Sequence, residues 1–584
     1  MTLTDKVGEV TQLAIDMISV GEPYNLKEPQ SLDSAKLRQV LVEHRVGSIL
    51  NVGAHAYTLD YWHEVIGTIQ RIATKEKPTG IPVLYGIDAI HGQNYTLGST
   101  LFPQQIGLAA TFNPAMAEEM GRITAYEAKA SWIPWNFSPV LDIGRNPLWS
   151  RTWETFGEDV HLAKAMGVAL IKGYQGEDIS DPYRVASCMK HFLGYSMSLN
   201  GKDRTQAYVP DRILREYVLP TFEAAIAAGS PTIMINSSEM NGIPVHSDKY
   251  ILTDLLRDEL GFEGLAVTDW EDIHFLYSRH RVAKDYKDAI RMAINAGIDM
   301  SMVPNDLDFP VLLKELVEEG AVPMSRIDES VARILTVKLQ LGLFENPIPN
   351  GDYSKFGSEE FAQVAYQAAA ESITLLKNDN NVLPLDKSST VAVIGPTANS
   401  LIAINGGWSR SWQGNDAQWD RSGKKNILEA IQAEIGAAKV RFAEGTTIDA
   451  AKNINAAVSA ARGAKAAVIC IGEMPYTEKP GDIDNLDLPE AQYDLIKAVA
   501  KTGTPIVLVM VQGRPRIINQ IESLADGIVM AYLPGDEGGR AIADVLFGDI
   551  NPSGKLPFTY PKYSNDINQN IGNGAATLVA GQVG

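Results

Sequence analysis

The 584-residue sequence predicts an α/β protein in which an N-terminal (β/α)8 barrel of the TIM type precedes a smaller αβα sandwich domain. Two observations predict this fold. Short apolar runs alternate with stretches in which apolar residues recur at i, i+3 and i+4, the spacing of an amphipathic helix. A segment rich in Pro, Gly and Asn separates this first series from a second one. Strands that alternate with helices pair in parallel, because each crossover connection must be long.

Seven apolar runs in the first series are the predicted barrel strands. They span residues 46–54, 81–92, 133–144, 185–195, 231–242, 264–270 and 296–304. Stretches between them, such as 212–229 and 285–297, have helical spacing, and several end in Gly, as helices often do. Because the number of units fits an eight-stranded barrel, we expect a closed sheet, although only seven strands can be named. The N-terminal residues 1–17 are charged and have a helix-like pattern.

The second series predicts a doubly wound α/β sandwich. Its five predicted strands span residues 389–396, 439–445, 465–473, 504–513 and 526–534. Helical patterns, such as 450–463 and 490–503, lie between them. We therefore divide the chain into a barrel at 1–345, a linker at 346–360, a sandwich domain at 361–562 and a weakly patterned C-terminal tail at 563–584.

Charge and composition exclude several classes of function. The formal net charge is -20, so nucleic acids and anionic membranes are poor partners. No run of 18 apolar residues occurs, so we predict no membrane span. The two cysteines, Cys188 and Cys470, lie in apolar runs and are predicted to be buried thiols rather than a disulfide. No zinc spacing, GxGxxG or P-loop motif is present, so we expect neither a metal nor a cofactor.

Polar and aromatic residues follow four of the predicted barrel strands. They are Asp88, Asp142, Arg145, Arg151, Lys190, His191, Asp269 and Trp270. The carboxyl ends of barrel strands meet at one mouth, so we expect these side chains to lie close together. Carboxylates and cationic donors bind sugar hydroxyls, and an indole packs on the apolar face of a sugar ring. The group therefore predicts a sugar-binding pocket.

Each of these residues also has a purely structural interpretation. Asp269 could cap the helix that follows its strand, and Trp270 could pack in the core. Lys190 and His191 could belong to a buried ion pair. Their occurrence together favours a shared function over these separate structural roles.

Hydrolysis of an acetal generally needs two carboxyl groups, one on each side of the bond that breaks. The second domain offers Glu473, which directly follows the apolar run "AAVICIG", where open α/β sheets place ligand groups. The alternative is that Glu473 is an exposed surface residue. Trp408 and Trp412 lie in the Gly- and Ser-rich segment "NGGWSRSWQGND" of the same domain and suggest a ligand contact.

Six motifs together resemble glycoside hydrolase family 3, most closely its exo-acting β-glucosidases and β-glucan exohydrolases. They are "YGIDAIHG", "RNPLWSRTWETFGED", "CMKHFLGY", "GFEGLAVTDW", "GGWSRSWQG" and "GEMPYTEKPGD". The resemblance covers about residues 1–562 and implies that a barrel and an αβα sandwich share one active site. It implies Asp269 as the nucleophile and Glu473 as the general acid/base. It further implies that Asp88, Arg151, Lys190 and His191 bind the terminal sugar and that Trp270 and Trp412 clamp the next one.

The function implied by the resemblance is that of a retaining exo-β-glucosidase, which removes terminal β-D-glucose from oligosaccharides or β-glucans through a covalent intermediate. The alternatives are a β-xylosidase or another glycosidase of the family, and a non-catalytic glycan-binding protein. The N-acetylglucosaminidase branch is disfavoured because the loop after "KHF" lacks its second His. Many members have Tyr near the nucleophile where this chain has Ser237, so the resemblance does not extend to the usual hydroxyl partner of the nucleophile.

The same resemblance has implications for the location of the protein. Related proteins are commonly exported, which implies a periplasmic or secreted location, whereas the N-terminus has no signal-peptide pattern and leaves the cytoplasm open. The expected partner is a β-glucoside oligosaccharide, with no nucleic acid or membrane, and the expected assembly is a monomer or a homodimer.

Overall fold

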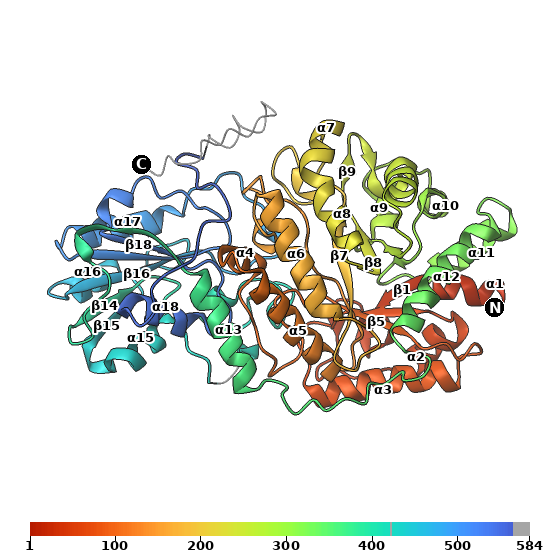
Figure 1. The fold of residues 1–584 in the computed structure, drawn as a ribbon, viewed down its shortest axis with the longest axis horizontal. Helices are drawn as coiled ribbons and strands as arrows, with labels where there is room; N and C mark the ends of the chain where they lie inside the picture. The colour runs from red at the N-terminus through yellow and green to blue at the C-terminus, as the bar shows by residue number, and fades with distance from the viewer. Residues whose placement is uncertain (421–422, 565–584) are drawn as a thin grey trace.

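The computed structural model describes residues 1–420 and 423–564. Two lobes lie side by side, and the chain passes once from the N-terminal lobe to the C-terminal one (Figure 1). The N-terminal lobe contains an eight-stranded sheet and the C-terminal lobe a six-stranded sheet. Most of the tail predicted at 563–584 lies outside the described residues.

The N-terminal sheet is a parallel barrel, as predicted. Its strands are β1 (Thr11–Ala14), β4 (Ser48–Leu50), β5 (Leu84–Ile87), β6 (Trp135–Asn136), β7 (Ala186–Phe192), β8 (Thr232–Ile235), β11 (Leu265–Val267) and β12 (Ser301–Met302). They follow the order β11-β8-β7-β6-β5-β4-β1-β12, and every neighbouring pair is parallel. A parallel bridge between Val267 and Met300 joins the two edges and closes the ring.

The eighth strand is β1, which the sequence did not indicate. Helix α1 (Leu3–Glu9) ends just before it, so the helix-like expectation for residues 1–17 is right for α1 and wrong for β1. All four residues of β1 are buried, because it pairs with β4 on one side and β12 on the other. A strand of four residues that is buried on both faces carries no alternation by which to recognise it.

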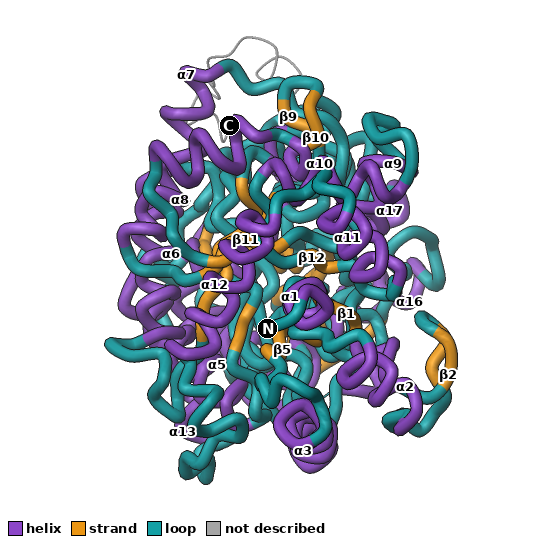
Figure 2. The backbone as a smooth tube through the Cα atoms, turned by 90° about the vertical axis from the view of Figure 1, so that its right-hand side faces the viewer, coloured by secondary structure: helices purple, strands orange, loops and turns teal. Residues whose placement is uncertain are grey.

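Helices surround the barrel strands, as Figure 2 shows from the barrel end of the molecule. They are α2 (Ser34–Arg38), α3 (Leu59–Lys75), α4 (Gln105–Ala110), α5 (Pro114–Ala130), α6 (Val160–Gln175), α7 (Asp211–Ile213), α8 (Leu219–Ala227), α9 (Asp272–Ser278), α10 (Tyr286–Ala296), α11 (Asp308–Glu318) and α12 (Met324–Gln340). In α3, the Thr58 side chain accepts a hydrogen bond from the amide of Tyr61 and so caps the helix. Residues such as Trp62, Val65 and Ile69 form its buried face.

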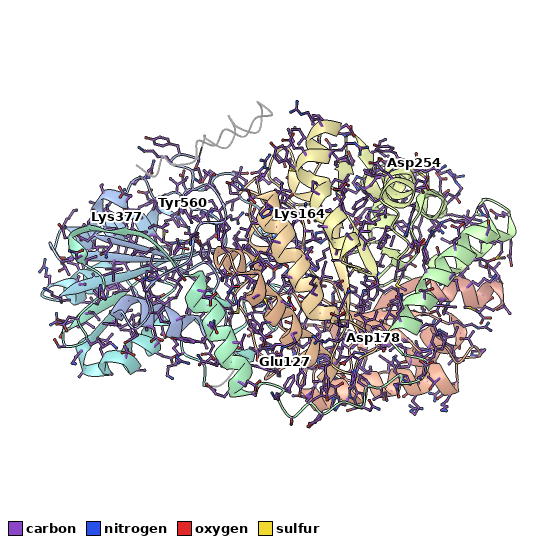
Figure 3. All side chains as sticks on the ribbon, in the orientation of Figure 1. Glu127, Lys164, Asp178, Asp254, Lys377 and Tyr560 are labelled. Atoms are coloured by element: carbon purple, nitrogen blue, oxygen red, sulfur yellow. The ribbon has the colours of Figure 1, made fainter. Side chains whose placement is uncertain are left out.

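After α12 the chain runs along the barrel before it enters the second domain. The hydroxyl of Tyr353 donates to the carbonyl of Pro182 at 2.6 Å, and the amide of Gly357 donates to Glu127 Oε1 at 2.9 Å. Glu127 is a buried residue of α5, at the lower edge of the barrel in Figure 3. Helix α13 (Glu359–Ser372) then packs against α4 and α5, so the linker and the first helix after it bind the two domains together.

The C-terminal domain is an αβα sandwich. Its sheet has the order β13-β18-β17-β16-β14-β15, with β13 (Thr374–Asn378), β14 (Val391–Ile394), β15 (Val440–Ala443), β16 (Ala466–Gly472), β17 (Ile506–Val511) and β18 (Gly527–Met530). Helices α13, α15 (Ile427–Ile435) and α18 (Gly538–Phe547) lie on one face, and α16 (Ile454–Ala461) and α17 (Glu490–Ala500) on the other (Figure 1). A short helix, α14 (Leu401–Asn405), follows β14.

Strand β13 is the second strand of the two large sheets that the sequence did not indicate. It pairs antiparallel with β18 at the edge of the sheet, and its register shifts between Leu375 and Lys377. The other strands were recognised as members of an alternating series of parallel strands and helices. β13 opens the domain directly after α13 and runs antiparallel, so it stands outside that series.

Two further expectations concern single features of the chain. Cys188 and Cys470 are both free and buried, which confirms that they form no disulfide. Within residues 1–420 and 423–564, no helix is long and apolar enough to span a bilayer.

Candidate active site

A cavity of about 390 Å³ lies where the barrel strands end, and both domains line it. Seven of the eight predicted site residues are in its wall: Asp88, Arg151, Lys190, His191, Asp269, Trp270 and Trp412. The eighth, Glu473, is absent from the wall, whereas Glu478 from the same loop is part of it. The arrangement combines a buried polar end, formed by the barrel, with a more open end to which the second domain contributes.

Asp269 follows β11 by two residues and is only 6% exposed. Its Oδ1 accepts the backbone amide of Trp270 at 2.5 Å and lies 3.5 Å from Arg204 Nη2. Its Oδ2 has no hydrogen-bond partner among the described residues and lies 3.9 Å from His191 Nε2. Burial by itself would raise the pKa of this carboxyl, but Arg204, Arg151 and the Trp270 amide hold it below its ordinary value. Asp269 is therefore an ionised, partly unsatisfied carboxylate that faces the cavity.

Asp88 and Lys190 form an ion pair at the buried end of the cavity. Lys190 Nζ lies 2.6 Å from Asp88 Oδ1, and the side-chain amide of Asn51 donates to Asp88 Oδ2 at 3.0 Å. Asp88 comes just after β5, and Lys190 lies near the end of β7. Their pairing agrees with the structural alternative considered from the sequence, yet both side chains also line the cavity. Such a pair can offer an acceptor and a donor to two neighbouring hydroxyl groups.

Arg151 and His191 complete the buried end. Arg151 binds Glu154 in a bidentate fashion: Nε donates to Oε1 at 2.9 Å, and Nη2 donates to Oε2 at 2.8 Å. The Nδ1 atom of His191 lies 2.9 Å from Asp142 Oδ2, so Nε2 is directed towards Asp269. Burial, followed by the charges of Arg151 and Lys190, lowers the pKa of His191 well below its ordinary value. The ring is therefore neutral and keeps one nitrogen for the cavity.

Arg204 is a central residue of the site that the sequence analysis missed. It lies in the loop after β7, where the segment "SLNGKDR" gives no strand or helix pattern. Its Nη2 atom lies 3.5 Å from Asp269 Oδ1 and 3.7 Å from Glu478 Oε2. Both distances are measured from the same nitrogen, so Arg204 brings a carboxylate of the barrel and a carboxylate of the second domain close together. The sequence offered one indication of its role: Arg204 lies in a Gly- and Asn-containing loop that follows β7, the strand that carries Lys190 and His191.

Glu473 is held in a separate cluster of cations. Its Oε1 lies 3.1 Å from Arg514 Nε and 2.9 Å from Arg516 Nη1, and the hydroxyl of Tyr476 donates to Oε2 at 3.1 Å. Burial would raise the pKa of this carboxyl, but Arg514 and Arg516 lower it below its ordinary value. Glu473 is thus an ionised carboxylate in which both oxygens accept hydrogen bonds.

Glu478 has the opposite properties. It lines the cavity 3.6 Å from Arg151 Nη1. Burial raises its pKa to about 7, against the opposing charges of Arg204 and Arg151. Its backbone has φ 56° and ψ -142°, a conformation that costs a residue other than Gly about 1–3 kcal/mol and is concentrated at functional sites. Glu478 is therefore a carboxyl group that can hold a proton near neutral pH and donate it into the cavity.

Comparison with known proteins decides the family. A model of the glycosyl hydrolase family 3 N-terminal domain matches residues 2–337, and a model of the C-terminal domain of this family matches residues 373–579. The chain belongs to glycoside hydrolase family 3. It is therefore a glycoside hydrolase, and the fold and the family expected from the sequence are confirmed.

Curated relatives and solved structures extend this result. The lysosomal β-glucosidase of Dictyostelium discoideum is 43% identical over 97% of this chain and 72% of its own length. The periplasmic β-glucosidase of Salmonella typhimurium is 35% identical over 97% of this chain and 74% of its own. A structure of the Listeria innocua β-glucosidase with glucose superposes with a TM-score of 0.86 at 30% identity, covering 97% of this chain and 76% of that one. The exo-1,3/1,4-β-glucanase of a Pseudoalteromonas species gives a TM-score of 0.85 at 30% identity, with coverage of 97% and 90%.

Aromatic residues line both the buried and the open part of the cavity in this glycoside hydrolase. Trp270 is half-buried, and its Nε1 donates to the hydroxyl of Tyr24 at 3.2 Å. Trp412 is 46% exposed, whereas Trp408 is buried, with its ring 5.8 Å from Lys190 Nζ. Tyr24 and Trp408 join the predicted Trp270 and Trp412 as aromatic lining residues, so flat apolar surfaces are available on several sides.

The loop that carries both Trp residues is anchored on the barrel. Arg410 Nη1 donates to the carbonyl of Thr96 and to Ser99 Oγ, both at 2.8 Å. Ser409 Oγ lies 3.0 Å from His91 Nε2, and the Gln104 side chain donates to the carbonyl of Gly407 at 2.9 Å. These buried contacts fix the second domain's contribution to the cavity against the first domain.

Ser237 and Arg145 are displaced from the centre of the site. Ser237 Oγ donates to Asp272 Oδ1 at 2.7 Å and accepts a hydrogen bond from Arg204, so it does not contact the carboxylate of Asp269. Arg204 approaches Asp269 directly instead, with 3.5 Å between Nη2 and Oδ1. Arg145 stacks on the ring of Tyr217 at 3.8 Å and is absent from the cavity wall.

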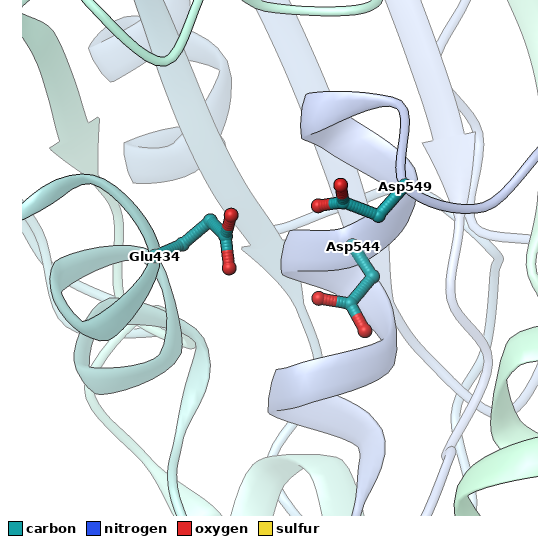
Figure 4. Close-up of side chains that lie close together, drawn as sticks. All are labelled: Glu434, Asp544 and Asp549. Carbon is teal, nitrogen blue, oxygen red and sulfur yellow. The ribbon is translucent and has the colours of Figure 1, made fainter.

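One acidic cluster in the described residues could be considered for a metal. Glu434, Asp544 and Asp549 lie together in the second domain, on α15 and at the end of α18 (Figure 4). Lys387 Nζ already lies 2.6 Å from Glu434 and 2.7 Å from Asp549. The third carboxylate, Asp544, lies 3.9 Å from Arg540 Nε and accepts a hydrogen bond from the Tyr366 hydroxyl, so the trio belongs to an ion-pair network and gives no reason to postulate a metal.

Proposed function

We propose that this glycoside hydrolase is a retaining exo-β-glucosidase, with Asp269 as the nucleophile and Glu478 as the general acid/base. One observation carries the proposal. A carboxylate from the barrel and a carboxyl group from the second domain approach the same nitrogen of Arg204 in one cavity, and they have opposite pKa shifts. Acid/base assignments in enzymes follow from such pairs of groups whose environments separate their pKa values.

The two carboxyl groups have the protonation states that the first step needs. Asp269, ionised, attacks the anomeric carbon while Glu478 donates its proton to the glycosidic oxygen, so the leaving sugar departs as a neutral alcohol. The result is a glucosyl ester on Asp269 and an ionised Glu478. Glu478 then takes a proton from water, whose oxygen attacks the anomeric carbon, and Asp269 is released as a carboxylate. Overall, one water molecule is consumed and the β-configuration is retained.

Glu478 replaces Glu473, the residue expected from the sequence, in this assignment. A general acid must hold a proton at working pH and reach the substrate. Glu473 is paired with Arg514 and Arg516, has a lowered pKa and does not line the cavity. Glu478 meets both requirements, since it lines the cavity and its pKa is raised to about 7.

The shape and polarity of the cavity support exo action. Asp88, Arg151, Lys190 and His191 form a buried end, and each is less than a tenth exposed. Such an end would accept one terminal glucose and no chain beyond it. We assign the next sugar to the open end, between Trp270 and Trp412, whose rings would pack against its C–H faces.

Trapping of the intermediate tests this assignment. The wild-type protein is incubated with 2,4-dinitrophenyl 2-deoxy-2-fluoro-β-D-glucoside, digested, and analysed by mass spectrometry. We expect a fluoroglucosyl adduct on the peptide that contains Asp269, and none on this peptide in the Asp269→Asn variant. An adduct on another residue would refute the assignment of the nucleophile. The 2-fluoro-xyloside, used in parallel, distinguishes glucose from xylose as the preferred sugar.

Location and assembly complete the proposal. We place the enzyme outside the cytoplasm, in the periplasm or secreted, because the Salmonella typhimurium relative is named periplasmic and the Dictyostelium discoideum relative lysosomal. We propose a β-glucoside oligosaccharide as its partner and a monomer or homodimer as its assembly. Cell fractionation tests the location, and light scattering of the purified protein tests the assembly.

A further inference from the structure

Two cations in the cavity wall lack the carboxylate partner that the other cations have. Lys190 pairs with Asp88, and Arg151 and Arg204 each approach carboxylates within 4 Å. Arg279 and Lys479 also line the cavity, but neither has an ion pair or a side-chain hydrogen bond within residues 1–420 and 423–564. No ion pair within 4 Å among the described residues is thus recorded for two cations in the wall of this pocket, which leaves them available to an anionic ligand.

Arg279 is held in place by an aromatic ring. It follows α9 directly, and its guanidinium group stacks over the ring of Phe275 at 3.7 Å. Its Nη1 atom is buried and has no hydrogen-bond partner among the described residues. A planar guanidinium group that is fixed on one face and has one nitrogen without a partner suits a carboxylate ligand.

Lys479 is exposed and follows Glu478 directly in the chain. Burial, followed by the charges of Arg279 and Arg204, lowers the pKa of its ammonium group, against the opposing charges of Asp203 and Asp482. The neighbouring carboxylates Asp203 and Asp272 each pair with Arg204, and each keeps one oxygen without a hydrogen-bond partner among the described residues. Asp272 accepts from Ser237 at 2.7 Å, Asp203 accepts from Tyr195 at 2.6 Å, and Asp482 accepts the amide of Asp203 at 2.9 Å.

The position of the two cations assigns them to the leaving group. The buried end of the cavity, around Asp88 and Lys190, is reserved for the terminal glucose in the proposed function. Arg279 follows the helix that begins just after Trp270, and Lys479 is next to the proton donor Glu478. The part of a substrate beyond the bond that breaks would therefore lie against them.

We propose that Arg279 and Lys479 form an anion-binding end of the pocket that selects β-glucosides whose leaving group carries a carboxylate. The inference rests on the proposed function, since it concerns the leaving group of that reaction. The two cations attract the carboxylate of the incoming substrate and release it, still ionised, with the leaving alcohol. Neither residue takes part in bond breaking.

Matched pairs of substrates test the proposal. The first pair is cellobionate and cellobiitol, which have the same glycosidic oxygen and differ in a carboxylate against a hydroxymethyl group. The second pair is the 4-carboxyphenyl and 4-carbamoylphenyl β-D-glucosides. We expect kcat/KM for the anionic member of at least one pair to exceed that for the neutral member about five- to tenfold at low ionic strength, and the preference to decline with added salt.

Variants show whether the two cations cause the preference. The Arg279→Gln and Lys479→Gln substitutions should each reduce the ratio of the two kcat/KM values about two- to fivefold, and Lys479→Glu should reduce it further. Because both substrates are measured on the same variant, a general loss of activity cancels in the ratio. Lys501, an exposed residue at the end of α17, gives the matched control: Lys501→Gln should leave the ratio unchanged.

The outcomes separate this inference from the proposed function. If the wild-type protein hydrolyses the neutral substrates but shows no preference in either pair, the anion-binding inference is overturned and the proposed function stands. A preference that persists in Arg279→Gln and Lys479→Glu would also overturn it. If no β-glucoside is hydrolysed, the proposed function fails instead. Lys479 is exposed, so its variants are expected to fold, and a thermal melt checks this.

Discussion

The two domains contribute to the pocket in different ways. The barrel presents Lys190, His191 and Asp269 at or just after the ends of strands, where the parallel sheet fixes their direction. The second domain instead reaches the pocket with loops, one carrying Trp408 and Trp412 and the other carrying Glu478. The difference teaches that a strand fixes the direction of a side chain only for residues at its end or one or two residues beyond it. A loop can place the functional group farther along the chain.

The sharpest test of this contrast compares the two glutamates of one loop. Glu478→Gln should lower kcat/KM for cellobiose about 10²- to 10⁴-fold, because no group then protonates the leaving oxygen. Glu473→Gln, the matched control, should lose less than about tenfold, because Glu473 does not line the cavity. Added azide should rescue Glu478→Gln on 2,4-dinitrophenyl β-glucoside and yield β-glucosyl azide. The same rescue in Glu473→Gln alone would return the assignment to Glu473.

The same comparison predicts a large effect of Glu473 on stability. Glu473→Gln leaves Arg514 and Arg516 buried without their carboxylate, so the free energy of unfolding should fall by about 3–5 kcal/mol. The pKa of Glu473 is lowered in the folded state, so its stabilisation is present above the unfolded pKa and is lost as pH falls. The difference between wild type and variant should therefore shrink in acid. Urea denaturation at several pH values measures it, with Glu444→Gln, from an exposed pair, as the control.

A smaller effect is expected in the pH profile of activity. Glu478 must be protonated and its pKa is raised to about 7, so kcat/KM should fall as pH rises through about 7. The charge of Arg204 lowers this pKa, so Arg204→Gln should move the alkaline limb to higher pH in addition to reducing the rate. In Glu478→Gln the limb should disappear. Persistence of the limb in that variant would show that another group controls it.

The smallest effect is expected for the exposed Trp412. Trp412→Ala should lower kcat/KM for β-linked glucose disaccharides about two- to tenfold, the range for loss of one aromatic contact. β-Glucosyl fluoride, whose leaving group is a single atom, should be much less affected. An equal loss on both substrates would mean that Trp412 supports the loop rather than binding the second sugar.

The sequence was sufficient for most of the fold because strand and helix patterns alternate regularly over both domains. Within the two large sheets it failed at β1 and β13, for different physical reasons. β1 has four residues and is buried on both faces, so it has no alternation. β13 is an antiparallel edge strand in an otherwise parallel sheet, which the expected order of elements excluded. Both strands were recognisable only from their neighbours in space.

The sequence likewise predicted most of the barrel side of the candidate site but not the residues on its loops. Six of the eight barrel residues assigned from strand ends line the cavity, all but Asp142 and Arg145. Glu473, which does not line it, was chosen because it directly follows β16. The backbone of this loop then passes through Glu478, whose positive φ no sequence rule assigns to a Glu. Arg204 lies in a loop without periodicity, so its approach to both carboxylates depends on tertiary structure alone.

The anchorage of Arg410 on Thr96 and Ser99 limits how the enzyme can be rebuilt. The isolated barrel would keep an attacking carboxylate but lack a proton donor, and the isolated sandwich domain would have the reverse defect. An engineer who exchanges second domains among homologues must therefore transfer the Trp-bearing loop together with the barrel surface that receives it. The interface between the two domains must therefore be kept intact for the enzyme to act.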